Sequence, residues 1–263
     1  MKTIIIPDIH NRVKQAEAIL AHEKDYDKVV FLGDYFDSWG DSADDAKKSA
    51  WWLRHSLQNP KHIHLWGNHD ISYGFRASVC KCSGYDLMKD SVINGIMTSS
   101  EYNQLRFFYF ADGWFCSHAG LHPHFLPPMW KDKDVNEANL TDWLTEETRK
   151  FKRDAQNNQL HWFNLAGDSR RHYKTGVDQG GLLWCDTSEF YPIDGLPQVF
   201  GHTPQDNFPL VVRGSTGLDC MSSSEVLARS FCQKESWNIA LDTHSKHYAV
   251  IIDGALTIKP TPL

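Results

Sequence analysis

The 263-residue chain lacks the features of a membrane protein and of a general nucleic-acid binder. No apolar run approaches the ~18–20 residues that a membrane-spanning helix needs. The first residues, MKTIIIPDIH, contain a three-isoleucine run that is too short for a signal peptide. Positive charge is not in excess, because 27 Lys and Arg face 33 Asp and Glu, for a net charge of −6. We therefore expect a cytoplasmic protein with no membrane partner and no general affinity for nucleic acid.

The sequence also lacks a paired cysteine framework. Its six cysteines are scattered along a long chain, which favours free thiols over disulfides. The CKC pair at 80–82 has a spacing that fits no common zinc motif, so a structural thiolate metal clip is not expected.

What the first half does have is an alternation of strand and helix patterns. Short β-rich apolar runs occur at 3–7, 28–32 and 62–66, and helical periodicity occurs between them at 12–23 and 42–57. This alternation is typical of βαβ units and predicts a largely parallel sheet, hence an α/β fold.

The second half changes character. Residues 114–118 are expected to form another strand, and the polar, charge-laced stretch at about 124–180 is expected to be a helical insertion or cap. Strand patterns return at 197–201, 237–241, 248–252 and 255–259, with an Asp-Gly turn at 253–254. We therefore expect one domain, 1–263, with antiparallel strands near its end.

Polar clusters follow five of the expected strands. The segments are DIH, GDYFD, GNHD, SHAG and GHTP. In open α/β sheets, ligands gather at the carboxyl ends of the strands, so these segments are expected to meet. The side chains that they deliver are Asp8, His10, Asp34, Asn68, His118 and His202.

The mixture of carboxylate, imidazole and amide ligands suits a hard or borderline divalent ion. Six ligands exceed what one tetrahedral ion uses, whereas two ions that share Asp34 would use them all. Each residue alone has an ordinary alternative, such as a helix cap, a turn or a core histidine. The occurrence of all five clusters in order at strand ends favours a two-metal site.

With these motifs the chain resembles the calcineurin-like metallophosphoesterases. The segments SHAGLHP, LLWCD, FGHTP and IALDT make it most similar to the branch of serine/threonine protein phosphatases and symmetrical dinucleoside tetraphosphatases. The resemblance implies a four-layer αββα sandwich of mixed sheets. It also implies two divalent ions, with manganese favoured over iron, zinc, cobalt, nickel or magnesium. One ion would be held by Asp8, His10 and Asp34, and the other by Asp34, Asn68, His118 and His202.

The chain departs from the family pattern at three positions. The branch commonly has an arginine after the second aspartate of GD-x-x-D, and Ser38 stands there. The wider family often has a second histidine in GH-x-H, and Pro204 stands there, so the first metal is expected to rely on water. His244 replaces a usual glycine, and we interpret it as a loop histidine rather than a site residue.

Two divalent cations would convert a bridging water to hydroxide, bind the phosphoryl oxygens and orient the ester for in-line attack. His69 is outside the expected ligand set and next to a carboxylate, so we expect it to be the general acid, with Asp70 as its orienting partner. Asp37 is expected to support the ligand shell through a hydrogen bond to a ligand histidine.

Without the usual arginine, another cation should bind the phosphate. The candidates are Arg12, Arg76, Arg170 and Arg171, each of which has the alternative of an ordinary surface arginine.

The leading functional hypothesis is hydrolysis of phosphomonoesters in a small molecule, a nucleotide or a phosphoprotein. The alternative is a phosphodiesterase or nucleotide pyrophosphohydrolase that uses the same metals with different pocket walls and cleaves cyclic nucleotides, dinucleoside polyphosphates or nucleic-acid ends. A catalytically inactive binding scaffold is disfavoured, because none of the implied ligands is missing.

Overall fold

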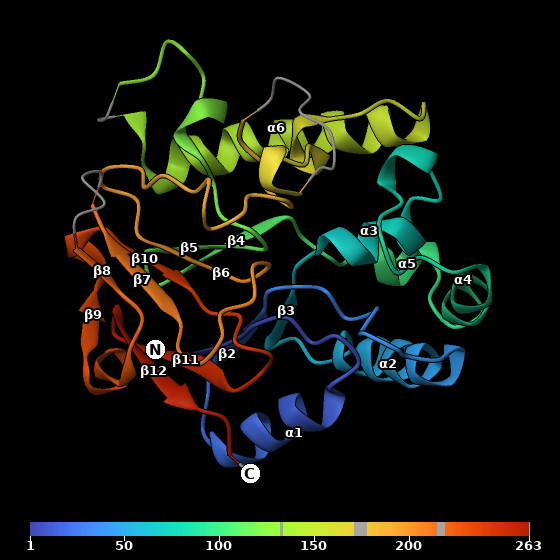
Figure 1. Ribbon diagram of the computed structural model, residues 1–263, viewed down its shortest axis with the longest axis horizontal. Helices are drawn as coiled ribbons and strands as arrows, with labels where there is room; N and C mark the ends of the chain where they lie inside the picture. The colour runs from blue at the N-terminus through green and yellow to red at the C-terminus, as the bar shows by residue number, and fades with distance from the viewer. Residues whose placement is uncertain (132–133, 171–177, 215–218, 263) are drawn as a thin grey trace.

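A computed structural model describes residues 1–131, 134–170, 178–214 and 219–262. Two six-stranded mixed sheets lie face to face between two layers of helices (Figure 1). The helices α1 and α2 lie beyond one sheet and α6 lies beyond the other. The expected α/β class and four-layer sandwich are confirmed.

The first sheet has the order β3-β2-β1-β11-β12-β9. Its strands β1, β2 and β3 are parallel, whereas β11, β12 and β9 are joined by antiparallel pairings. Their bounds are Lys2–Ile6 (β1), Lys28–Phe31 (β2), His62–His64 (β3), His247–Ile252 (β11), Ala255–Pro260 (β12) and Ser230–Cys232 (β9).

The second sheet has the order β4-β5-β6-β10-β7-β8. The central strands β5, β6 and β10 are parallel, and β4, β7 and β8 join them in antiparallel pairs. Their bounds are Phe108–Ala111 (β4), Trp114–Ser117 (β5), Gln198–Phe200 (β6), Trp237–Ala240 (β10), Leu210–Arg213 (β7) and Asp219–Met221 (β8).

The first strands are apolar on both faces because both faces are covered. On β1 and β2, Ile5 and Val30 join the core between the sheets, whereas Ile4 and Val29 join the core under the helices. This packing explains why III and VVF read as continuous apolar runs rather than alternating ones.

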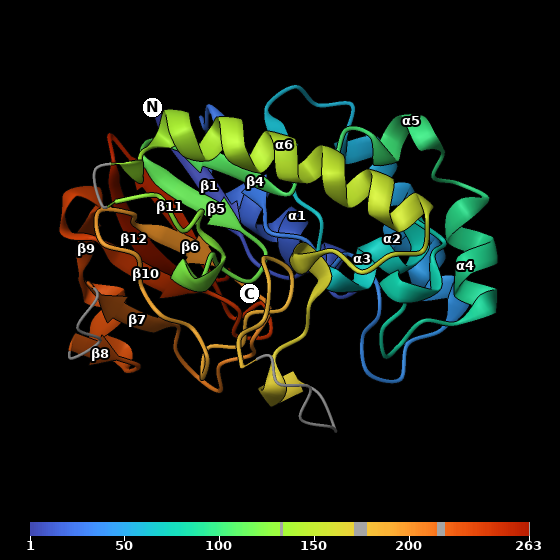
Figure 2. The ribbon, with the colours of Figure 1, turned by 90° about the horizontal axis from the view of Figure 1, so that it is seen from above.

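The helices fall into three groups. Helices α1 (Val13–His22) and α2 (Ala43–Ser56) cover the first sheet, and α6 (Glu137–Gln156) crosses the outer face of the second (Figure 2). Three shorter helices extend the molecule to one side. They are α3 (Asn68–Gly74), α4 (Leu87–Asn94) and α5 (Ser99–Tyr102). The 3₁₀ turns are Ser78–Cys80, Pro123–Phe125, Trp162–Asn164, Asp168–Arg170, Ser224–Ala228 and Gln233–Glu235.

Helix α6 lies within the stretch 124–180. It buries Leu140, Leu144 and Phe151, and the ring of Phe151 lies 4.7 Å from that of Phe107, just before β4. The helix therefore packs directly on the second sheet. The organisation into one domain with an insertion or cap stays a prediction.

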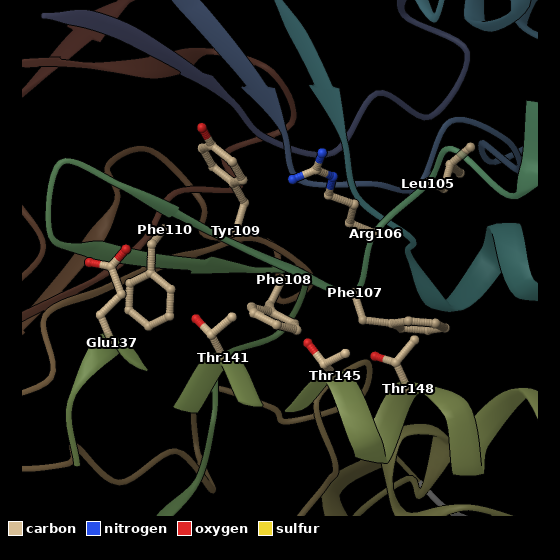
Figure 3. Close-up of a pocket in the computed structure, with 10 residues that line it drawn as sticks. All are labelled: Leu105, Arg106, Phe107, Phe108, Tyr109, Phe110, Glu137, Thr141, Thr145 and Thr148. Atoms are coloured by element: carbon tan, nitrogen blue, oxygen red, sulfur yellow. The ribbon is translucent and has the colours of Figure 1, made fainter. Parts of the chain in front are cut away.

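A groove of about 480 Å³ runs along part of the contact between α6 and β4 (Figure 3). Thr141 and Thr145 project from the helix toward Phe108 on the strand. Among the described residues, no helix is long and apolar enough to cross a membrane.

Candidate active site

The five polar clusters meet where the two sheets end. They follow β1, β2 and β3 of the first sheet and β5 and β6 of the second. Five of the six expected ligands are buried, and His10 is partly exposed. The structure therefore brings together all the ligands that the sequence predicts: Asp8, His10, Asp34, Asn68, His118 and His202.

The backbone bends sharply at these strand ends. His10, Asp34 and His202 have positive φ angles of 42°, 49° and 69°, which are uncommon outside glycine. Two glycines allow the loops to approach closely. A Cβ on Gly33 would lie 2.6 Å from the backbone nitrogen of Gly67, and a Cβ on Gly67 would lie 2.1 Å from Oδ1 of Asp34. These glycines let the β2 and β3 loops pack against each other.

The first ligand set is Asp8, His10 and Asp34, with one ligand atom of each within 4.8 Å of the others. Nδ1 of His10 lies 2.6 Å from the backbone oxygen of Asp37. This hydrogen bond leaves Nε2 of His10 to face Oδ2 of Asp34, 3.5 Å away.

The second set contains Asp34 again. Its Oδ2 lies 3.5 Å from Nε2 of His118, whose Nδ1 is bonded to the backbone oxygen of Leu32 at 2.9 Å. Oδ1 of Asn68 lies 2.8 Å from Nε2 of His118 and 3.0 Å from Nδ1 of His202. One oxygen of Asp34 thus lies between a histidine of each set.

The chemistry of these groups fits two bound cations. Burial, with the charges of Asp242 and Asp34, raises the pKa of Asp8 well above its usual range. Nε2 of His202 is buried and has no hydrogen-bond partner among the residues that the structure describes. Buried carboxylates that repel one another and imidazole nitrogens that lack donors are stabilised by a divalent ion.

His69 lies beside the ligands. Its Nδ1 is 3.1 Å from Oδ2 of Asp37, and its ring centre is 5.3 Å from that of His10. Burial would lower the pKa of His69, but the charge of Asp34 and the hydrogen bond to Asp37 raise it well above the usual value. The arrangement favours a protonated imidazole held by Asp37.

Asp70 does not orient His69, so that prediction is wrong. Its carboxylate accepts three backbone N–H bonds of 2.8 Å, from Asp34, Tyr35 and Gly67. The reason is its position in the first turn of α3, from which it reaches back to cap the helix start. Asp70 instead fixes the β2 loop that carries Asp34.

The predicted role of Asp37 also needs correction. The candidate ligand His10 bonds the backbone oxygen of Asp37, not its carboxylate. The carboxylate binds His69, Tyr73 and the buried amine of Lys89. The sequence pattern gave no signal for Lys89, which comes from α4 and lies 52 residues from Asp37.

The candidate arginines lie in different places. Nε of Arg170 pairs with Asp186 at 2.7 Å, and its guanidinium also reaches Oγ1 of Thr203, next to His202. Arg12 donates to Oγ of Ser245 at 3.3 Å. Arg76 is exposed just past α3. Arg171 lies outside the described residues.

A hollow of about 320 Å³ opens beside the candidate metal ligands and is lined in part by Cys82, Arg170 and Trp184. Sγ of Cys82 lies 3.6 Å from Nδ1 of His69, and the ring of Trp184 lies 5.6 Å from that of His202. The segments CKC and LLWCD contain two of these residues, but spacing alone does not place them at the site.

The calcineurin-like phosphoesterase family matches residues 1–206, more than three quarters of the chain, and covers all the ligand motifs. The chain belongs to this family. Members share the metal-dependent hydrolysis of phosphate esters, and the candidate ligand sets of this chain agree with that chemistry. This protein is therefore a hydrolase that acts on phosphate esters.

One solved structure shares the fold at low sequence identity, and two further matches are weaker. A metallophosphoesterase from Sphaerobacter thermophilus is 14% identical, with a TM-score of 0.51 over 100% of this chain and 88% of that one. A putative diadenosine tetraphosphatase is 19% identical, with a TM-score of 0.48 over 99% and 94% of the two chains. A serine/threonine phosphatase from Saccharomyces cerevisiae is 10% identical, with a TM-score of 0.46 over 100% and 80%. No curated protein matches the sequence.

Proposed function

We propose that this protein hydrolyses phosphomonoesters at a two-metal site. The observation that carries the proposal is the position of Asp34, whose Oδ2 lies 3.5 Å from Nε2 of both His10 and His118. One carboxylate oxygen placed between two ligand sets is what a bridging ligand requires. His69 lies beside this point, ready to transfer a proton.

Asp8, His10 and Asp34 would hold one ion, and Asp34 with Asn68, His118 and His202 would hold the other. When bound, two divalent cations neutralise the phosphoryl oxygens and lower the pKa of water toward neutral pH. Manganese is the first ion to test, because the site offers oxygen and imidazole ligands without thiolates.

His69 would protonate the leaving oxygen. Its Nδ1 is engaged by Asp37, so the proton that it donates is carried on Nε2. Asp37 is itself fixed by the hydroxyl of Tyr73 at 2.6 Å and the amine of Lys89 at 3.0 Å. These contacts keep the ring in one orientation, which general acid catalysis needs.

Arg170 is the described arginine that we propose for the substrate phosphate. It lines the hollow beside His69 and lies against Thr203, next to the ligand His202. A monoester dianion carries one more negative charge than a diester, so a guanidinium at the hollow favours the monoester.

The test is a rate panel with manganese. p-Nitrophenyl phosphate would be compared with bis-p-nitrophenyl phosphate, cyclic nucleotides, diadenosine tetraphosphate and a phosphopeptide. We expect monoesters to turn over fastest. Preferential cleavage of the diesters or of diadenosine tetraphosphate would replace the proposal with the alternative activity. Absence of turnover of every ester in manganese, iron or zinc would refute both.

The role of His69 has its own test. His69→Asn should slow alkyl phosphates by about 10²–10⁴-fold and nitrophenyl phosphate much less, since nitrophenolate leaves without a proton. His124→Asn is the matched control, because His124 is an exposed histidine outside the site. Equal slowing of both ester types would show that His69 is not the general acid.

A further inference from the structure

A sixth strand end contributes to the same corner of the molecule. Strand β10 runs parallel to β6, with Ala240 opposite Phe200, and the N–H of Leu241 donates to the backbone oxygen of Phe200. Asp242 lies two residues past the end of β10, and its backbone oxygen accepts a hydrogen bond from the N–H of Gln205 at 2.8 Å, so it lies beside the loop that carries His202. The segment LDT therefore lies beside the loops that carry the candidate metal ligands.

The carboxylate of Asp242 is only partly satisfied. The residue is 1% exposed, and its Oδ1 accepts a hydrogen bond from the N–H of His244 at 2.9 Å. Its Oδ2 is buried without a partner among the residues that the structure describes. A buried carboxylate oxygen without a donor or cation is unfavourable, so this atom calls for a positive or hydrogen-bonding ligand.

The position of Asp242 relative to Asp8 indicates which of the two ligand sets it lies near. The N–H of His202 donates to both carboxylate oxygens of Asp8, at 3.1 and 3.0 Å. The hydroxyl of Ser245, three residues past Asp242, donates to the backbone oxygen of Asp8 at 3.3 Å. Asp8 is one of the three ligands in the first set. The unsatisfied carboxylate is therefore on the side of the first metal ion.

Asp242 is outside the first candidate ligand set. Ligand atoms of the first set lie within 4.8 Å of one another, and Asp242 is not among them. Octahedral ligands about 2.1 Å from an ion are at most about 4.2 Å apart. A water molecule fits between a cation and a carboxylate placed just outside that shell.

We propose that Asp242 belongs to the first metal site, where its Oδ2 accepts a hydrogen bond from a water ligand of the cation held by Asp8, His10 and Asp34. This inference rests on the proposed two-metal function. A water held by Asp242 would supply that cation with an oxygen ligand, since Pro204 cannot supply an imidazole. The additional carboxylate favours a hard ion such as Mn²⁺.

The test compares Asp242→Asn with the unchanged protein, after removal of metal. Asparagine keeps an oxygen for the N–H of His244 and removes the charge. By elemental analysis and calorimetric titration with Mn²⁺, we expect the unchanged protein to bind two ions. We expect the variant to bind one of the two ions at least 10-fold less tightly and the other with unchanged affinity. The metal-free variant should unfold at the same temperature or higher, because an unpaired charge next to Asp8 is gone.

Glu147→Gln is the matched control. Glu147 is also buried, but it lies on α6, where it pairs with Lys150 and Trp162. This change should leave both Mn²⁺ affinities unchanged.

Two results would overturn the inference: Mn²⁺ affinities of Asp242→Asn equal to those of the unchanged protein, or a metal-free variant that is less stable or unfolded. Either would assign Asp242 a structural role. If the unchanged protein itself bound no Mn²⁺, iron or zinc, the proposed function would fail instead.

Discussion

The buried amine of Lys89 offers the sharpest test of how this site is supported. It donates to Oδ1 of Asp37 at 3.0 Å, to Oδ1 of Asp41 at 2.5 Å and to the backbone oxygen of Gly84 at 3.2 Å. All three of its donors are thus used. The side chains of Lys89, Asp37 and Asp41 are 10%, 3% and 5% exposed. Lys89→Met would remove the cation that these two carboxylates share.

Removing one partner of a buried ion pair costs about 3–5 kcal/mol. For a chain of this size, that loss lowers the melting temperature by roughly 6–20 °C. The measurement is urea unfolding of the metal-free protein at pH 7.5, followed by tryptophan fluorescence. Lys89→Met combined with Asp41→Asn should recover part of the loss, because one uncompensated charge is removed.

Lys48 provides the control. It also bridges two acids, Asp44 at 3.0 Å and Asp45 at 3.3 Å, but its side chain is 64% exposed. Lys48→Met should leave the free energy of unfolding unchanged within error, since exposed ion pairs contribute little. If the Lys89 and Lys48 variants lost equal stability, or the Lys89 variant lost less than about 1 kcal/mol, burial would not be the source of the effect.

Three further predictions concern the loops and helices around the site. Gly67→Ala should reduce the bound metal measured by elemental analysis, because its Cβ would lie 2.1 Å from Oδ1 of Asp34, whereas Gly95→Ala should not. Burial lowers the pKa of His64 well below 6.5, so below that pH the unfolded chain binds a proton that the folded chain excludes. Thermal unfolding should therefore show stability falling as the pH drops below 6.5, and His64→Gln should flatten this dependence. Ser42→Ala should cost about 1 kcal/mol in urea unfolding, because it removes the cap of α2.

The sequence was informative wherever a local pattern reports on local structure. The apolar runs predicted β1 and β2 because buried parallel strands are apolar on both faces, and the polar segments after them predicted Asp8 and Asp34 as neighbours. Contacts set by side-chain direction were not predictable. Asp70 is adjacent to His69 in sequence, yet on α3 the two side chains point to different partners.

Long-range support was also beyond sequence reasoning. Lys89 reaches Asp37 from a separate helix, and no spacing rule links them. The buried Oδ2 of Asp242, which has no hydrogen-bond partner among the described residues, can be recognised only once the pairing of β10 with β6 is known.

The second ligand set draws on both halves of the sandwich. Asp34 and Asn68 follow strands of the first sheet, whereas His118 and His202 follow strands of the second. An ion bound by all four residues would cross-link the two sheets at one edge. A free metal concentration of 100 times the dissociation constant would add about 2.7 kcal/mol to the free energy of unfolding. The supply of metal would therefore govern how long the folded chain survives proteolysis, as well as how fast it works.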